Sequence, residues 1–205
     1  MDSTTRLLAL GDSFTFGEAV PSGERWPSHL RRLLERRGLA VAEPMVLAVT
    51  GWTTGELADA ISMARLDPPY DLVTLLIGVN DQYRGYGVDA YERGFAGLLE
   101  TALALAGDRP DRLIVISIPD YSVMPFAQDY DPPAIRAALE QFNAVNRRQA
   151  HAAGARYVDV TAAARAAATD AALIARDGLH PSGKMYAAWA QLLLPDALAA
   201  LGIQS

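Results

Sequence analysis

Short apolar runs alternate with longer amphipathic stretches along almost the whole chain. Each apolar run has the length of one β-strand and is closed by glycine, proline or a polar residue. The runs that predict strands cover residues 7–10, 46–49, 72–77, 113–118 and 156–160. The amphipathic stretches predict helices over residues 23–37, 55–64, 89–106, 133–153 and 183–194, the last of which is either continued or broken at Pro195.

The order of these elements predicts the fold class. Strands that alternate with helices form a parallel sheet whose two faces are covered by the helices. The runs 72–77 and 113–118 are almost entirely apolar, as expected of strands buried on both faces. We therefore expect an α/β fold with a parallel five-stranded sheet. Because no linker or repeat interrupts the pattern, residues 1–205 are interpreted as one domain, and the alanine-rich stretch 162–175 as helix interrupted at residues 169–170.

Composition narrows the chemistry that such a fold could support. The chain has 205 residues, which is enough for a core that needs neither a metal nor a disulfide. It has no cysteine, which excludes disulfides, iron–sulfur clusters, thiolate zinc sites and a cysteine nucleophile. No group of His, Asp and Glu has the spacing of a metal site, and no carboxylate pair suggests glycosidase chemistry. We expect no metal and no cofactor.

Charge and hydropathy indicate which partners and which cellular location to expect. With 18 Lys and Arg against 24 Asp and Glu, the formal net charge is −6, so a nucleic-acid partner is not expected. No segment is apolar for long enough to span a bilayer, and we expect no stable membrane insertion. The first apolar run, residues 7–10, is too short for a signal peptide, which favours a cytoplasmic protein. The sequence predicts no particular oligomeric state.

Residues at the carboxyl ends of the predicted strands matter most, because parallel sheets bind ligands at that edge. Ser13 follows the first strand in the segment Gly-Asp-Ser-Phe, where a strand-to-helix turn exposes a hydroxyl. A serine becomes an effective nucleophile only with a base within hydrogen-bond reach. Of the three histidines, His29 and His151 lie inside predicted helices, whereas His180 lies just before the last one. Asp177, three residues earlier, could orient the His180 ring and stabilise its charged form.

Acyl transfer by such a serine also needs hydrogen-bond donors for the negative oxygen of the tetrahedral intermediate. Three groups near the strand ends could supply them, namely the backbone N–H groups of Ser13 and Gly51 and the side-chain amide of Asn80. All three would lie along one edge of the predicted sheet. The residues therefore predict nucleophilic ester chemistry at this edge.

The sequence also resembles the SGNH hydrolases, a GDSL-like family named after four residues in separate blocks. Ser13 lies in Gly-Asp-Ser, Gly51 follows the second predicted strand, and Asn80 lies in Gly-Val-Asn-Asp. Asp177 and His180 match the family's Asp-x-x-His, and the first block departs from Gly-Asp-Ser-Leu only by ending in phenylalanine. The resemblance spans nearly the whole chain and implies a three-layer α/β/α fold with a flavodoxin-like sheet. It further implies an esterase or lipase with a Ser-His-Asp triad and an oxyanion hole made by Ser13, Gly51 and Asn80.

We expect a small-molecule ester as the substrate, with an acetyl ester as one option. The family spans lysophospholipids, thioesters, acetylated sugars and aryl esters, so lysophospholipase and thioesterase activity stay open. The absence of a long apolar lid in the sequence favours small esters over lipids. A binding module that uses the same fold and pocket without turnover is the alternative outside the enzymes.

Aromatic residues after the second, third and fourth predicted strands are candidates for the substrate pocket, although large rings also pack at such rims. The residues proposed to bind substrate are Trp52, Tyr83, Tyr121 and Phe126, with Tyr86 nearby. The segment 121–131 is the expected substrate-side loop or lid. Arg84 is interpreted as one half of a surface ion pair, with binding of an anionic substrate as its alternative.

Two glycine motifs resemble nucleotide-binding loops. Residues 85–90 fit Gly-x-Gly-x-x-Ala, but they do not directly follow a strand and are interpreted as a glycine loop beside the site. Residues 178–184 resemble a P-loop, but Met185 stands where Mg²⁺ needs Ser or Thr, and residues 181–183 fit a helix start. A flavodoxin-like nucleotide protein would fit the topology, but Asp12 would repel a phosphate in the first loop.

Overall fold

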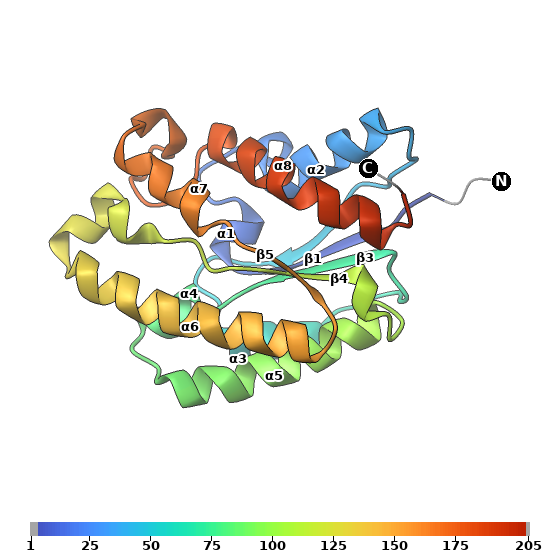
Figure 1. The fold of residues 1–205 in the computed structure, drawn as a ribbon, viewed down its shortest axis with the longest axis horizontal. Helices are drawn as coiled ribbons and strands as arrows, with labels where there is room; N and C mark the ends of the chain where they lie inside the picture. The colour runs from blue at the N-terminus through green and yellow to red at the C-terminus, as the bar shows by residue number, and fades with distance from the viewer. Residues whose placement is uncertain (1–3, 204–205) are drawn as a thin grey trace.

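A computed structural model describes residues 4–203. Its centre is one parallel sheet of five strands in the order β2-β1-β3-β4-β5 (Figure 1). The strands are β1 (Leu7–Gly11), β2 (Met45–Ala48), β3 (Leu72–Leu76), β4 (Leu113–Ile116) and β5 (Arg156–Val158). Each strand lies within two residues of the run that predicts it, and the expected α/β fold with a flavodoxin-like strand order is confirmed.

Helices cover both faces of the sheet and give the fold its three layers (Figure 1). On one face, α2 (Trp26–Arg36) packs against α8 (Gly183–Ala200), with the short α7 (Thr161–Arg165) against α8. On the other face, α5 (Val88–Leu105) packs against both α3 (Thr54–Met63) and α6 (Pro132–Ala152). The connections between parallel strands are therefore helical crossovers, as the alternating pattern predicts.

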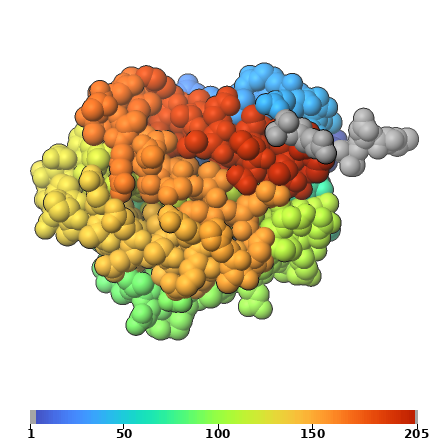
Figure 2. Space-filling model, viewed as in Figure 1, coloured from blue at the N-terminus to red at the C-terminus, as the bar shows by residue number. Residues whose placement is uncertain are grey.

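The core lies between the sheet and these two helical layers. Every residue of β1, β3 and β4 is buried, because the central strands are covered on both faces. Trp26 in α2 and Trp189 in α8 are fully buried, as are Phe95 in α5 and Phe142 in α6. In the space-filling view, the orange segment that contains β5 lies between the helical layers of α6 and α8 (Figure 2). Within residues 4–203, no helix has the length and apolar character that crossing a membrane requires.

Two helical segments differ from the pattern-based prediction. The helix predicted over residues 23–37 begins only at Trp26, after the 3₁₀ turn η1 (Ser22–Glu24), because Pro27 is accommodated in a first helical turn. The alanine-rich stretch is interrupted at residues 169–170, as predicted, but 3₁₀ turns replace α-helix beyond residue 165. It forms three short turns, α7, η5 (Ala166–Ala168) and η6 (Ala171–Leu173), the last of which is capped by the Asp170 side chain.

The last helix, α8, continues through Pro195 to Ala200. A proline inside a helix removes one backbone hydrogen bond, which disfavours continuation. Here Ala197 and Leu198 beyond the proline are fully or almost fully buried, and their burial offsets that loss.

Two short helices that the apolar pattern does not predict lie at the carboxyl edge of the sheet. They are α1 (Ser13–Phe16) directly after β1 and α4 (Val79–Tyr83) shortly after β3. A helix of four or five residues is too short to show a hydrophobic period, so nothing in the pattern marks it. From β1 the chain passes to β2 on one side and then crosses back to β3 on the other, so the topological switch point lies between β1 and β3, close to the loops that follow β1, β2 and β3.

Candidate active site

Ser13 is the first residue of α1, directly beyond the end of β1. The Asp12 side chain caps α1 by accepting a hydrogen bond from the Phe14 N–H at 3.0 Å, and Gly17 ends the helix in the left-handed conformation at φ 75°. This tight turn places Ser13 at the carboxyl edge of the sheet, where only 4% of its surface is exposed. As the first helical residue, it has a backbone N–H without an acceptor inside its own helix.

His180 lies opposite Ser13, in the loop that leads into α8. Its Nε2 is 2.9 Å from the Ser13 Oγ, and its Nδ1 is 2.6 Å from the Asp177 Oδ2. The Ser182 side chain caps α8, and a bridge between Ile174 and Pro181 closes the loop, so the backbone on both sides of His180 is held. The structure therefore brings Ser13, His180 and Asp177 into one chain of hydrogen bonds.

The hydrogen-bond partners of Asp177 determine which nitrogen of His180 carries the proton. Burial raises the pKa of Asp177, but hydrogen bonds from the His180 ring and from two backbone N–H groups outweigh it and hold the pKa below its usual value. An ionised carboxylate can only accept, so the Nδ1 of His180 is the donor to Asp177. The Nε2 of His180 is then free to accept the hydroxyl proton of Ser13.

The two other predicted oxyanion donors line the same cleft as Ser13. Gly51 lies after β2 with φ +90°, a conformation that favours glycine. Asn80 lies in α4, and its amide donates one hydrogen bond to the Trp52 carbonyl at 2.9 Å, which leaves its second N–H for another acceptor. The structure thus gathers Ser13, Gly51 and Asn80 around one small space.

This space, which we call the Ser13 cleft, has a volume of about 150 Å³. Of the aromatic residues proposed to bind substrate, Tyr83, Tyr121 and Phe126 line the cleft, whereas Trp52 does not and contributes its carbonyl to Asn80. Other lining residues were missed by sequence reasoning, because they are apolar or small residues without a chemical signature. The lining residues of this second kind are Phe14, Thr50, Val79 and Leu179.

The segment 121–131 borders the cleft and is built from two 3₁₀ turns, η3 (Tyr121–Val123) and η4 (Pro125–Asp129). It is tied to the His180 loop by a hydrogen bond from the Phe126 N–H to the Gly178 carbonyl at 3.0 Å. It is tied to α4 through the hydroxyls of Tyr130 and Tyr83, which are 3.0 Å apart. In the structure this segment is a wall of the cleft.

Asp12 and Asp81, the chain neighbours of the cleft residues Ser13 and Asn80, carry buried carboxyl groups, and sequence reasoning missed this feature. Both are fully buried. Asp81 accepts hydrogen bonds from the Thr54 hydroxyl at 2.6 Å and from its N–H, whereas the Oδ2 of Asp12 has no partner among the described residues. Burial raises the pKa of Asp12 to about 7, against the hydrogen bond from Phe14, and the nearby Asp81 contributes to the rise. The Asp12 carboxyl is therefore largely protonated in mildly acidic solution.

The raised pKa of Asp12 predicts a specific pH dependence of stability. Because the pKa rises from 3.8 to about 7 on folding, the native state binds more protons than the unfolded state between these pH values. The free energy of unfolding is then lowered as the pH rises through this window. Asp12→Asn keeps a capping oxygen but has no such charge. We expect its stability relative to wild type to increase by about 2 to 3 kcal/mol between pH 5 and pH 8.

Urea unfolding of both proteins at the two pH values measures this difference. Asp59→Asn, at an exposed position of α3, is the matched control and should show a difference that does not vary with pH. A pH-independent difference for Asp12→Asn as well would contradict an elevated pKa at this residue.

The other motifs have structural roles. His29 lies in α2 and His151 in α6, as predicted. Arg84 forms the expected ion pair, with its Nη1 at 3.3 Å from the Glu56 carboxylate. Ser182 is the N-cap of α8, so the P-loop-like segment is a helix start, as predicted. Among residues 4–203 no cluster of His, Asp and Glu has metal-binding geometry.

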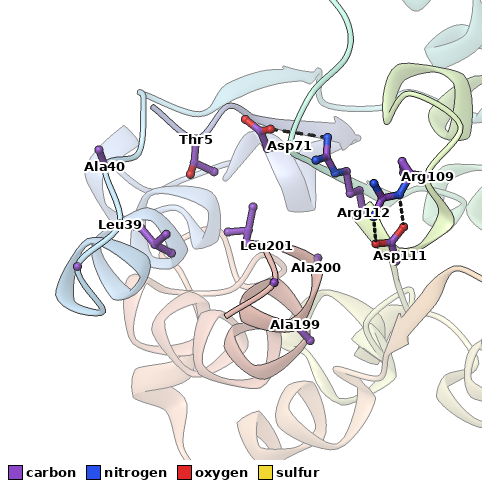
Figure 3. Close-up of a pocket in the computed structure, with 12 residues that line it drawn as sticks. Thr5, Leu39, Ala40, Asp71, Arg109, Asp111, Arg112, Ala199, Ala200 and Leu201 are labelled. Atoms are coloured by element: carbon purple, nitrogen blue, oxygen red, sulfur yellow. Dashed lines mark hydrogen bonds and ion pairs between the residues drawn. The ribbon is translucent and has the colours of Figure 1, made fainter. Parts of the chain in front are cut away.

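A larger cavity of about 520 Å³ lies at the opposite edge of the sheet (Figure 3). Its lining comes from segments that precede β1, β2, β3 and β4 and from the end of α8. Its charged groups are paired with one another, Arg109 with Asp111 at 2.7 Å and Arg112 with Asp71 at 3.7 Å. Its described lining residues include no serine or histidine.

Solved structures with the same fold support this architecture. The structure of TesA is similar with a TM-score of 0.76 and 17% sequence identity, over 96% of this chain and 100% of that chain. Axe2, an acetylxylan esterase from Geobacillus stearothermophilus, has a TM-score of 0.70 and 23% identity over 100% and 98%. The psychrotrophic esterase EstA from Pseudoalteromonas sp. has a TM-score of 0.67 and 16% identity over 97% of each chain. At these identities the similarity shows a shared fold.

The family assignment rests on the sequence. No curated protein sequence matches the chain. The model of the GDSL-like lipase/acylhydrolase family matches residues 9–188, a range that contains Ser13, Gly51, Asn80, Asp177 and His180. The chain therefore belongs to the GDSL-like lipase/acylhydrolase family.

Proposed function

We propose that the protein is a serine ester hydrolase that cleaves small, uncharged acyl esters, with Ser13, His180 and Asp177 as its catalytic triad. The observation that carries the proposal is the chain of hydrogen bonds from the Ser13 hydroxyl through the His180 ring to the Asp177 carboxylate. It lies in a cleft at the carboxyl edge of a parallel sheet, in a chain that belongs to an acylhydrolase family. A module that only binds its ligand would have no need for a nucleophile aligned with a base.

In the first half of the reaction, the Ser13 Oγ attacks the carbonyl carbon of the ester while its proton passes to the Nε2 of His180. The Asp177 carboxylate holds the Nδ1–H and stabilises the imidazolium that forms. When the tetrahedral intermediate collapses, the C–O bond to the alcohol breaks and His180 returns the proton to the leaving oxygen. Ser13 then carries the acyl group as an ester.

In the second half, His180 takes a proton from a water molecule, and the hydroxide attacks the acyl carbonyl. The second tetrahedral intermediate collapses to the free acid, and the proton on His180 returns to the Ser13 Oγ. In both intermediates the negative oxygen accepts hydrogen bonds from the N–H groups of Ser13 and Gly51 and from the Asn80 amide. Ser13 and Asn80 belong to short helices and Gly51 belongs to a hydrogen-bonded loop, so these donors are positioned before the charge develops.

The size and lining of the Ser13 cleft support a short acyl group. Its volume of about 150 Å³ is below the roughly 300 to 1,000 Å³ of pockets that bury drug-sized ligands. Apart from the reacting groups, most of the cleft is formed by apolar and aromatic side chains, and no Lys, Arg, Asp or Glu is among its described lining residues. An acetylxylan esterase among the similar structures is consistent with a small acyl group, although the shared fold does not select the alcohol.

A series of p-nitrophenyl esters tests this proposal. We expect measurable hydrolysis of p-nitrophenyl acetate, the highest kcat/KM for acyl chains of two to four carbons, and a fall of about tenfold or more at eight carbons, a loss of roughly 1.4 kcal/mol of transition-state binding. The physical reason is that a longer chain must leave the cleft or force its walls apart. Absence of turnover on every short ester would contradict the proposal.

The variants Phe126→Ala and Tyr130→Ala form a matched pair for the same series. Phe126 lines the cleft, and Tyr130 packs against it at a ring distance of 5.3 Å without lining the cleft. Removing the Phe126 ring should shift the preference toward longer acyl chains, and removing the Tyr130 ring should not. A preference that already rises through the eight-carbon ester in wild type would exclude a short-acyl cleft.

A further inference from the structure

The segment 50–54, which follows β2 and carries Gly51, is held at every residue by a side chain. The Thr50 hydroxyl donates to Glu18, and the Gly51 carbonyl accepts from the Arg84 guanidinium. The Asn80 amide donates to the Trp52 carbonyl, and Thr53 and Glu56 form a capping box. The Thr54 N–H and hydroxyl donate to the Asp81 carboxylate. We call residues 50–54 the oxyanion loop, because they contain the proposed donor Gly51.

Three of the side chains that bond the oxyanion loop belong to α4 and its C-cap, namely those of Asn80, Asp81 and Arg84. Asn80 and Arg84 are four residues apart, so they lie on the same side of the helix, one turn from each other. They donate hydrogen bonds to successive carbonyls of the oxyanion loop, Arg84 to that of Gly51 at 2.7 Å and Asn80 to that of Trp52 at 2.9 Å. The short helix α4 and its C-cap therefore hold two successive peptide groups of the oxyanion loop in place.

Arg84 has features that separate it from an ordinary surface ion pair. Its Nη2 bonds the Gly51 carbonyl while its Nη1 lies 3.3 Å from the Glu56 carboxylate, which itself accepts from the Thr53 N–H and hydroxyl. One guanidinium thus bridges the loop and the first turn of α3. The side chain is 41% exposed and is not among the residues that line the Ser13 cleft, so it does not contact a substrate bound there.

We propose that Arg84 is a positioning residue that orients the oxyanion loop through the Gly51 carbonyl. The proposal rests on the proposed function, since it concerns the donor that would hold the negative oxygen. Gly51 has φ +90°, and glycine rotates more freely about its backbone bonds than any other residue. Without the hydrogen bond from Arg84, the peptide groups on either side of Gly51 can turn, and the proposed donor N–H loses its fixed orientation. Oxyanion donors contribute to catalysis only when they are held in place before the reaction.

The same geometry excludes a role for Arg84 in binding an anionic substrate inside the cleft. The Glu56 carboxylate neutralises its charge through Nη1, and its Nη2 already donates to the Gly51 carbonyl. A positioning role predicts a loss in kcat with neutral substrates, whereas a binding role predicts a change in KM confined to anionic ones.

The test uses Arg84→Met, Arg84→Lys and a matched control, Arg148→Met. Arg148 forms an exposed ion pair with Glu92 at 2.7 Å between α6 and α5, away from the cleft. With p-nitrophenyl acetate, we expect Arg84→Met to lower kcat by about 10-fold to 100-fold, less than the roughly 100-fold to 1,000-fold loss of a whole donor, and to leave KM within about twofold. Arg84→Lys should lie between Arg84→Met and wild type, because an ammonium cannot make the fork-shaped pair of contacts. The control should match wild type.

Chemical rescue separates positioning from a general loss of structure. Millimolar guanidinium chloride should restore several-fold activity to Arg84→Met by occupying the vacated space, and it should have no such effect on wild type or Arg148→Met. Thermal unfolding of all variants shows whether the fold is intact. If Arg84→Met is poorly folded, the kcat of Arg84→Lys at unchanged melting temperature decides instead.

The possible results of this experiment are distinguishable. Activity of Arg84→Met within twofold of wild type, or a rise in KM at unchanged kcat, overturns the inference while leaving the proposed function intact, provided that Ser13→Ala is inactive. Full activity of Ser13→Ala overturns the proposed function and the inference with it. A kcat loss that guanidinium rescues supports both.

Discussion

Replacement of Ser13 by alanine is expected to lower kcat for p-nitrophenyl acetate by about 10⁴-fold to 10⁶-fold. The hydroxyl is the proposed nucleophile, and its Oγ is 2.9 Å from the base that would take its proton. The backbone of α1 does not depend on this side chain, because Asp12 supplies the cap and Gly17 ends the helix. The N–H donors of the oxyanion hole therefore persist, and the fold of the variant should match wild type by circular dichroism and thermal unfolding.

A fluorophosphonate probe gives an independent measurement of the same site. Wild type should be labelled once, at Ser13, and labelling should compete with p-nitrophenyl acetate. Ser13→Ala and His180→Ala should both fail to react, and the double variant should be no worse than either single one, because the two groups act as one unit. Hydrolysis by Ser13→Ala at the wild-type rate, or labelling of another residue, would refute the assignment.

Replacement of Asp177 by asparagine is expected to lower kcat by about 10³-fold to 10⁴-fold with little effect on KM. The Oδ1 of Asp177 accepts hydrogen bonds from the backbone N–H groups of Leu179 and His180, both at 3.0 Å. An asparagine must keep its oxygen on these two donors, so its NH₂ group faces the Nδ1 of His180. The Nδ1 must then accept, the proton moves to the Nε2, and the Nε2 can no longer accept from Ser13.

The control for this variant is Asp170→Asn. Asp170 pairs with Lys184 at 2.6 Å near the same loop, but it lies outside the Ser13 cleft. Its replacement should leave kcat unchanged, which separates the tautomer of His180 from the loss of one negative charge in this region. If Asp177→Asn retained more than about one tenth of the wild-type kcat, Asp177 would not be what orients His180.

Much of the fold follows from local pattern, as the strands show. β1, β3 and β4 are short apolar runs closed by glycine or proline, and their type and position are set by residues within a few places of each other. In the alanine-rich stretch the predicted interruption at residues 169–170 is present, but the segments around it are short and partly 3₁₀ turns, because alanine favours a helix without determining its length. Contacts such as the Ile174–Pro181 bridge, which close the loop that leads into α8, decide where those turns end.

The residues of the candidate site also fall into two groups, those that the sequence identifies and those that only the structure identifies. Ser13, Asn80, Asp177 and His180 carry chemical types at strand or helix boundaries, so the amino-acid sequence is enough to single them out. Phe14, Val79 and Leu179 have no such signature, and only their place in the cleft identifies them. Arg84 was correctly predicted to form an ion pair, but its bond to the Gly51 carbonyl links residues 33 positions apart and has no local signal.

The amino-acid sequence is enough to place strands and helices in order along the chain, because hydrophobic periodicity is local, and to identify which reactive groups exist. With no cysteine and one histidine beside a suitable carboxylate at a strand edge, few nucleophile and base pairs were open. The folded chain is needed to show that the Ser13 Oγ and the His180 Nε2, from residues 167 positions apart, lie 2.9 Å from each other. That distance depends on strand order, helix packing and loop closure together, and each of these is a balance of long-range contacts that no short segment encodes.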